Sequence, residues 1–349
     1  MKIRLLGSLI ILVFSLLCPE LGAEDGSMQE VDLHNIDVPI ICYHSVIPDN
    51  KSTYNFHPDQ LEAHLKYFKE NNYQAITALQ FMKLQKMPEF FPKKPIMLTF
   101  DDGYKSHYQY VLPLLQKYGM QATFFVCPEL IAEKSDRSLT WGELREMARA
   151  GMDIQSHTMS HPDLAELAVK GDPESLSKLE YELKSSKEII EEKLKRKVNL
   201  LAYPYGYFTK EVEDAAVKAG YEGIFTVNWG TNSPDENPLR IKRMALVSKM
   251  SLEMIEPHIT SKPLRVEIIS PIEASVITEK PVIKFKPLDP GINRVDVMVR
   301  SMHKSLRPDD DGVYTYEPRI KKPGYYMVII RGYDTQGYLN MGSWGFYYQ

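Results

Sequence analysis

Two adjacent carboxylates, Asp101 and Asp102, follow the apolar residues 96–98 and come directly before Gly103. Two carboxylates at the end of a strand repel each other, so one of them needs a cation or a proton nearby. The pattern suggests a division of roles, in which one carboxylate binds a metal and the other stays free as a base. A turn that caps a helix would use the same residues, since glycine allows a sharp bend, so this motif alone leaves both interpretations open.

Two histidines, His157 and His161, form a second polar cluster after the short apolar segment 152–155. Imidazoles four residues apart are expected on one side of a helical turn, within reach of a single ion. With Asp102 they would give two histidines and one carboxylate, a set that leaves coordination positions open for water and substrate. We therefore predict a divalent metal site at Asp102, His157 and His161.

Three further positions are candidates for chemistry. The segment 203–206, Tyr-Pro-Tyr-Gly, would form a rigid loop whose free backbone N–H groups could face a developing oxyanion. His44 ends the first predicted strand and could donate a proton, although a lone histidine there is more often structural. His258, near the end of the predicted barrel, is a competing proton donor that we rank below His44.

In this order, the motifs resemble those of the polysaccharide deacetylases of carbohydrate esterase family four, whose catalytic unit is the NodB-homology domain. Residues 99–104, Thr-Phe-Asp-Asp-Gly-Tyr, match the first motif of that family, and residues 156–161, Ser-His-Thr-Met-Ser-His, match the second. The resemblance covers about residues 38–260. It implies a distorted (β/α) barrel with one or more strands missing, and hydrolysis of N-acetyl groups on a polysaccharide with release of acetate.

The resemblance also implies roles for individual residues. Asp101 would be the general base, and Asp102, His157 and His161 would hold a divalent metal, most often zinc, with cobalt, nickel or manganese as alternatives. The backbone N–H of Tyr205 would help to form the oxyanion hole. The polysaccharide would be the binding partner.

The segment 42–44, Cys-Tyr-His, looks like that of the subgroup that acts on poly-β-1,6-N-acetylglucosamine in biofilms. In that subgroup the catalytic acid lies on this early strand, which favours His44 over His258. One position departs from the family, because Ala202 stands where many members have an arginine that holds the catalytic aspartate. Arg240 and Arg243 are candidates to reach the same place from a later strand.

Two other functions fit the same residues. One is a catalytically weak or silent protein that binds polysaccharide, which the departure at Ala202 would favour. The other is a deacetylase that acts on peptidoglycan, chitin or acetyl-xylan, because the motifs describe the reaction centre and not the sugar.

The elements that would position these side chains alternate between short apolar runs and amphipathic stretches. Strands are predicted at 39–46, 94–100, 122–126, 152–155, 200–203 and 224–227, and helices at 58–72, 108–118, 140–150, 173–197 and 210–219. Thr140 and Glu143 predict a capping box at the start of one helix. Alternation of this kind predicts a parallel sheet, open or closed into a barrel, and barrels place their chemistry at the carboxyl ends of the strands.

The pattern changes beyond residue 262, where short β-rich runs follow one another with turn residues between them. We predict a deacetylase domain at 38–262, followed by a small all-β immunoglobulin-like sandwich at 263–349.

The amino terminus predicts export. Lys2 and Arg4 precede the apolar run 5–17, which is typical of a signal peptide ending at residue 23, with a polar leader at 24–37. The apolar run is too short to span a bilayer comfortably, so no transmembrane segment is expected in the mature chain. We expect a secreted or periplasmic protein, or one associated with the cell envelope; a lipid anchor at Cys18 is the less favoured alternative.

Charge and cysteine content narrow the alternatives. The formal net charge is −4, which gives no general reason to bind nucleic acid or an anionic membrane. After removal of the signal peptide only Cys42 and Cys127 remain, so no cysteine cluster could hold zinc. They could be free core residues or a disulfide, and their spacing alone does not decide between the two.

Overall fold

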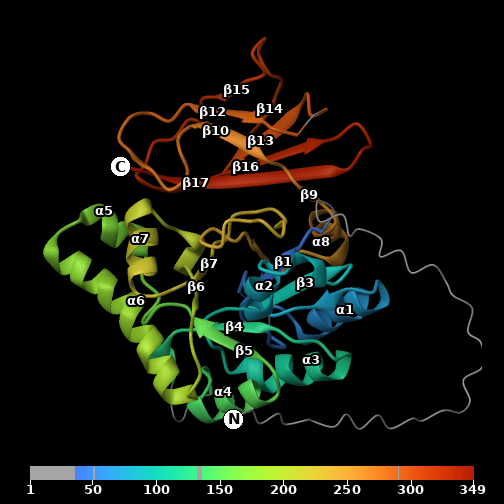
Figure 1. The fold of residues 1–349 in the computed structure, drawn as a ribbon, viewed down its shortest axis with the longest axis vertical. Helices are drawn as coiled ribbons and strands as arrows, with labels where there is room; N and C mark the ends of the chain where they lie inside the picture. The colour runs from blue at the N-terminus through green and yellow to red at the C-terminus, as the bar shows by residue number, and fades with distance from the viewer. Residues whose placement is uncertain (1–35, 50–51, 132–135, 290) are drawn as a thin grey trace, which may run out of the picture. The chain divides into compact units, whose positions relative to one another are not determined.

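A sheet of parallel strands organises the first part of the chain in the computed structural model, which describes residues 36–49, 52–131, 136–289 and 291–349 (Figure 1). The strand order is β7–β6–β5–β4–β3–β1–β8, and β2 pairs with β3. These strands are β1 (Ile40–Tyr43), β2 (Gln74–Ala75), β3 (Pro95–Phe100), β4 (Thr123–Val126), β5 (Asp153–Ser156), β6 (Leu200–Ala202), β7 (Gly223–Phe225) and β8 (Met244–Ala245). The predicted parallel sheet is confirmed.

The sheet curls toward closure. Phe225 at the end of β7 forms a parallel bridge with Ile241, just before β8, and β8 is paired with β1 at the other end of the strand order. Every residue of β3 is buried, as expected when a parallel strand is covered on both faces. The result is the distorted (β/α) barrel that the resemblance implies.

Helices follow the strands along the chain and pack around the sheet. They are α1 (Pro58–Glu70), α2 (Ala78–Leu84), α3 (Leu112–Tyr118), α4 (Trp141–Arg149), α5 (Leu164–Lys170), α6 (Pro173–Leu194), α7 (Lys210–Lys218) and α8 (Leu252–Ile259), with short turns η2 (Pro88–Phe90), η3 (His107–Val111, π-helical), η4 (Pro128–Leu130) and η5 (Pro204–Gly206). The predicted capping box is present, because Thr140 Oγ accepts the N–H of Glu143 while the Glu143 carboxylate accepts the N–H of Thr140. The sequence patterns predicted neither α2, α5 nor β8.

The long helix α6 packs against α5 and α7, and Figure 1 shows the three together on one side of the sheet. The apolar side of α6 is buried at Leu179, Leu183, Ile190 and Leu194, whereas Leu176 is exposed. Leu176 lies in the first turn of the helix. A carboxylate, Glu182, is buried on the same face of α6.

Two β-sheets follow α8. One contains β10 (Val266–Ser270), β12 (Ile283–Pro287) and β15 (Tyr314–Tyr316), and the other contains β9 (Lys262–Pro263), β11 (Val276–Ile277), β13 (Val295–Val299), β14 (Met302–Leu306), β16 (Gly324–Tyr333) and β17 (Leu339–Tyr348). Phe285 of the first sheet and Trp344 of the second belong to one buried cluster, so the sheets share a core. This all-β part agrees with the predicted sandwich, whose immunoglobulin-like type stays a prediction.

The boundary predicted at 262/263 falls inside β9, which pairs with β17. Nearby, Arg240 of the barrel bonds to Glu213 on α7 and to Glu273, which precedes β11. The residues from 36 onward belong to one compact unit. The division into domains therefore stays a prediction.

Several sequence predictions concern residues outside the described part of the chain. The signal peptide at 1–23 lies wholly outside it, as does the leader up to residue 35. Within the described ranges, no helix combines the length and apolar character needed to cross a membrane.

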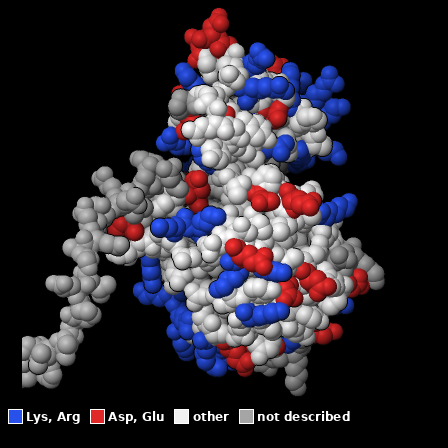
Figure 2. Space-filling model, turned by 90° about the vertical axis from the view of Figure 1, so that its right-hand side faces the viewer, with Lys and Arg blue, Asp and Glu red and all other residues white. Residues whose placement is uncertain are grey.

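Cys42 and Cys127 are free and buried, so they are core residues and not a disulfide. Figure 2 shows acidic and basic side chains interspersed over the lower part of the face it draws.

Stability should depend on pH through His64, which lies in the core beside Tyr43, with 2.9 Å between Nδ1 and the hydroxyl. Burial lowers the pKa of His64 from 6.5 to about 4. Between pH 6.5 and 4 the unfolded chain therefore binds a proton at His64 that the folded protein does not bind. The contribution of neutral His64 to the free energy of unfolding is complete above pH 6.5 and is lost as the pH falls toward 4. We expect His64→Gln to remove about 3 kcal/mol from the decline in unfolding free energy across this window, measured by denaturant titration at each pH. The exposed His303→Gln serves as control, and a His64→Gln profile as steep as that of the wild type would contradict the prediction.

Candidate active site

The two adjacent carboxylates lie at the carboxyl end of β3 and diverge there. Asp101 continues from the buried strand and is only 2% exposed. Asp102 and Gly103 then take positive φ angles of 75° and 80°, which turn the chain sharply. A Cβ atom at Gly103 would lie 2.9 Å from Ile131 Cδ1, and the positive φ angle itself disfavours any residue with a side chain. The two carboxylates are thus given different surroundings.

Asp101 forms a bidentate ion pair with the buried Arg243. Nη1 of Arg243 lies 2.8 Å from Oδ1 and Nη2 lies 2.9 Å from Oδ2. Burial acts to raise the pKa of Asp101, but attraction to the Arg243 guanidinium outweighs it and holds the pKa below its ordinary value. Asp101 is therefore an ionised, fixed carboxylate.

Arg243 holds Asp101 in place of the arginine that many family members have where this chain has Ala202. It comes from the segment between the closing bridge at Ile241 and β8, and its Nε also donates to the Thr226 carbonyl at 2.9 Å. Arg240, the other candidate, bonds to Glu213 and Glu273 instead. The arginine thus reaches the aspartate from the segment just before β8, the last strand of the sheet.

The two histidines converge, but the predicted helical turn is wrong. Residues 157–161 form an irregular loop after β5, in which Thr158 and His161 take positive φ angles of 67° and 66°. The left-handed residues fold the loop back on itself, and the ring centroids of His157 and His161 lie 4.8 Å apart. The two histidines, four residues apart in the sequence, are therefore brought together by a loop and not by a helical turn.

His157 presents Nε2 toward Asp102. Its Nδ1 lies 2.8 Å from the Ala202 carbonyl, which can only accept, so Nδ1 carries the proton and Nε2 is free to bind a cation. Burial lowers the pKa of His157 to about 4, which keeps the ring neutral. This backbone contact orients the ligand as metal-binding histidines usually require.

The three predicted ligands fit a divalent cation. Asp102 Oδ1 lies 3.5 Å from Nε2 of His157 and 3.5 Å from Nε2 of His161. Ligand atoms about 2.1 Å from a tetrahedral zinc ion lie about 3.4 Å apart, which agrees with this spacing. Asp102 Oδ1 is buried without a hydrogen-bond partner, while the Tyr104 hydroxyl bonds to the same carboxylate. The orphaned oxygen and two nitrogens form the donor set that zinc or a related metal prefers.

Tyr205 lies beside this cluster, in η5. Its ring centroid is 4.7 Å from that of His161, and its φ of 60° is unusual for a residue with a side chain. The next residue must be glycine, because a Cβ atom at Gly206 would lie 2.3 Å from Cγ2 of Val227. This tight packing fixes the backbone at Tyr205, as expected for a group that donates its N–H.

The two candidate proton donors lie in different places. His44 follows β1, and its side chain and the Asp101 carboxylate each offer an atom to a cluster with Cys42 that spans no more than 4.8 Å. The described contacts of His258 are with Trp229 and Met341, beside the C-terminal sheets. The geometry favours His44, whose assignment as acid stays a prediction.

Two residues near the carboxylate were missed by the sequence analysis. His107, in the π-helical turn η3, donates from Nε2 to the His44 carbonyl at 2.9 Å and so fixes the backbone there. The Cys42 thiol donates to Asp101 Oδ2 at 3.3 Å. His107 lies in no recognisable motif. Cys42 begins the Cys-Tyr-His segment, but nothing in the sequence indicated that its thiol contacts Asp101.

The comparisons with known proteins agree with the fold and with the class of protein that the motifs indicate. The family model described as polysaccharide deacetylase matches residues 90–224. YxkH of Bacillus subtilis (strain 168), which carries the name of a polysaccharide deacetylase, is 30% identical over 224 residues, 64% of this chain and 76% of YxkH. The chain therefore belongs to the polysaccharide deacetylase family and is an enzyme of that class.

Two further relatives bear on the particular reaction. The poly-β-1,6-N-acetyl-D-glucosamine N-deacetylase of Staphylococcus aureus (strain MRSA252) is 25% identical over 202 residues, 55% of this chain and 68% of the relative. The deacetylase PplD of Streptococcus pyogenes, solved in complex with acetate, is 27% identical with a TM-score of 0.57, over 64% of this chain and 98% of that structure.

Proposed function

We propose that this polysaccharide deacetylase hydrolyses N-acetyl groups of an N-acetylglucosamine polymer in a metal-dependent reaction that releases acetate. One observation carries the proposal. A buried carboxylate oxygen of Asp102 has no hydrogen-bond partner and lies 3.5 Å from the nearest nitrogen of each of two histidines. A second carboxylate, Asp101, lies beside it and is held apart by Arg243.

Asp102, His157 and His161 would hold the cation, for which we propose zinc, with cobalt, nickel and manganese as alternatives. When bound, such a cation supplies Lewis acidity, which polarises a carbonyl oxygen and makes a water molecule more acidic. The neutral state of His157 and the free oxygen of Asp102 suit this role.

The protein's own groups would handle the protons and the developing charge. Asp101 would take the proton of the attacking water at Oδ2, the oxygen that lies 3.8 Å from Nε2 of His157. The backbone N–H of Tyr205 would donate to the oxyanion of the tetrahedral intermediate, a contribution of about 3–4 kcal/mol for one well-placed donor. His44 would then protonate the leaving nitrogen, because an unprotonated amine is a poor leaving group. The products are acetate and a free amine on the sugar.

The substrate assignment rests on the relatives. An enzyme named for poly-β-1,6-N-acetyl-D-glucosamine is 25% identical to this chain, which favours that polymer. Peptidoglycan, chitin and acetyl-xylan are the alternatives. A binding protein without catalytic activity is disfavoured. Arg243 forms the ion pair with Asp101 that Ala202 cannot form.

We further propose that the chain acts outside the cytoplasm, as a secreted, periplasmic or envelope-associated protein. Its N-terminal pattern supports this location, as does the polymer for which a relative is named. The sandwich from residue 263 on is proposed as an accessory domain.

Removal of the cation should abolish acetate release. We expect wild-type protein supplied with Zn²⁺ to release acetate from an oligomer of β-1,6-linked N-acetylglucosamine, and to stop when a chelator is added. His161→Ala removes one of three ligands, so we expect it to lose both the bound metal and the activity, as measured by metal analysis and acetate assay.

The exposed His303→Gln is the control and should keep both properties. Unchanged metal content in His161→Ala would refute its role as a ligand. Acetate release that persists in chelator would refute metal dependence. Parallel assays with β-1,4-linked oligomers, peptidoglycan and acetyl-xylan distinguish the substrates.

A further inference from the structure

The loop between the two histidines holds an unusual backbone conformation. Thr158 and His161 both have positive φ angles, of 67° and 66°, although neither is glycine. Such conformations persist only where the surrounding structure holds them in place. The position of Nε2 of His161 depends on this loop, because four residues separate it from the end of β5.

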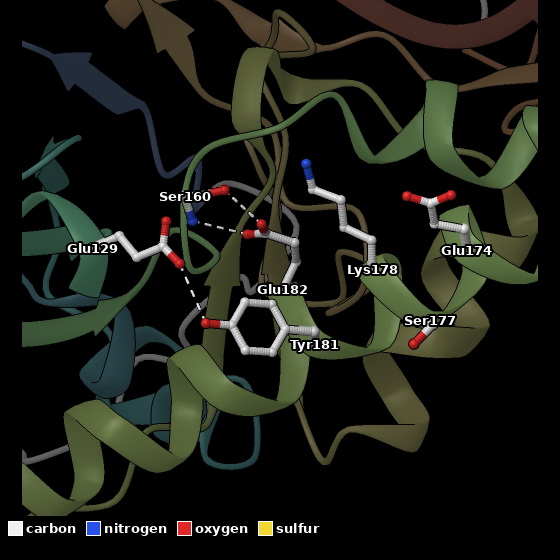
Figure 3. A pocket seen from close by; sticks show the side chains of 7 residues that line it. All are labelled: Glu129, Ser160, Glu174, Ser177, Lys178, Tyr181 and Glu182. Carbon is white, nitrogen blue, oxygen red and sulfur yellow. Dashed lines mark hydrogen bonds between the residues drawn. The ribbon is translucent and has the colours of Figure 1, made fainter.

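A buried carboxylate on α6 forms hydrogen bonds with this loop. Glu182 is 1% exposed. Its Oε2 accepts the N–H of Met159 at 2.9 Å and that of Ser160 at 2.8 Å, and its Oε1 accepts the Ser160 hydroxyl at 2.5 Å. Figure 3 shows the Glu182 carboxylate pointing at Ser160, at the edge of a cavity of about 560 Å³. Three hydrogen bonds from one side chain thus fix two consecutive residues of the loop.

Other contacts complete the support from both sides. The N–H of Glu129 donates to the Met159 carbonyl at 3.1 Å. Ser186, one turn beyond Glu182 on α6, lies 2.8 Å from the Ser156 hydroxyl, which accepts the N–H of Thr158 at 3.3 Å. Residues four apart share one helix face, so α6 presents both side chains to the loop.

Among the described residues, the Glu182 carboxylate forms no ion pair with a basic side chain. Its hydrogen bonds there are with the loop alone. In the reaction centre, Asp102 is one of the proposed ligands, and Asp101 is paired with Arg243. A buried carboxylate is stable only where hydrogen bonds or a cation compensate it. An additional negative charge behind the ligand loop complements a divalent cation in front of it.

We propose that Glu182 is a positioning residue that holds the loop 158–160, and with it His161, in the geometry that binds the cation. The inference rests on the proposed metal-dependent function. Glu182 acts through the loop and touches neither cation nor substrate. Partners of this kind typically change metal affinity by about 10- to 100-fold when they are removed.

The test compares Zn²⁺ affinity, by competition with a chromophoric chelator, in wild type, Glu182→Gln and Glu182→Ala. Glutamine keeps the size of the side chain but loses the charge and one acceptor oxygen, so we expect affinity about 10-fold weaker. Alanine removes all three hydrogen bonds, and we expect a loss of about 100-fold. The exposed Glu180→Gln makes the same charge change on the same helix and should leave affinity unchanged.

Melting temperatures with and without Zn²⁺ separate positioning from general stabilisation. The proposal expects Glu182→Gln to reduce the rise in melting temperature that Zn²⁺ produces, because that rise follows affinity. A lower melting temperature without metal, combined with an unchanged Zn²⁺-induced rise and unchanged affinity, overturns the positioning role and leaves the proposed function intact. Failure of the wild type to bind Zn²⁺ overturns both. If Glu182→Ala does not fold, Glu182→Gln decides the outcome alone.

Discussion

Asp101→Asn is expected to lower kcat for acetate release by about 100- to 10,000-fold while the protein keeps its bound cation. The amide that replaces the carboxylate cannot take a proton from water near neutral pH, yet its oxygen can still accept from Arg243. The ligand atoms of Asp102, His157 and His161 are untouched. Steady-state acetate release and metal content measured on the same preparation check the prediction.

Asp310→Asn, an exposed change in the β-sandwich region, is the control and should match the wild type. A normal kcat in Asp101→Asn would show that another group acts as base. A variant that loses its metal together with its activity would show that Asp101 is itself needed for binding the cation.

Arg243→Met is expected to destabilise the fold by about 3–5 kcal/mol, because it leaves the buried Asp101 carboxylate without its cation. Both side chains are almost fully buried, at 0% and 3% exposure, so water cannot replace the lost partner. Methionine keeps an unbranched apolar stem, although a shorter one, and adds no new polar group. Equilibrium unfolding in denaturant measures the change in free energy.

The surface pair of Arg265 and Asp289 provides the matched comparison. The Arg265 side chain is 68% exposed, so Arg265→Met should cost no more than about 1 kcal/mol. If Arg243→Met costs as little, then the buried pair does not stabilise the fold. Reduced activity in a variant of normal stability would then indicate a role in orienting Asp101 alone.

The sequence predicted the parallel sheet because most of its strands are short apolar runs separated by amphipathic helices. Elements that lack this contrast were missed. β8 has only Met244 and Ala245, too few residues to show a period, and α5 is a short helix whose capping residue, Asp163, gives only a weak signal. Leu176 follows the period of α6 but lies in its first turn, where no neighbour covers it.

The ligand cluster was predictable because its residue types and spacing form compact motifs. The residues that orient it were not, since each comes from a distant part of the chain. Arg243 was one of two candidates, and only the closure of the sheet distinguishes it from Arg240. The conformation of residues 157–161 depends on contacts with Glu182, which reads in the sequence as one more charge on a charged helix.

The closing bridge at Ile241 has a consequence for how the enzyme matures. Every proposed ligand is synthesised before Arg243, which arrives only with the segment that seals the sheet. A nascent chain that has not yet made this segment would carry an uncompensated carboxylate at Asp101. Formation of the buried ion pair is thus coupled to completion of the barrel.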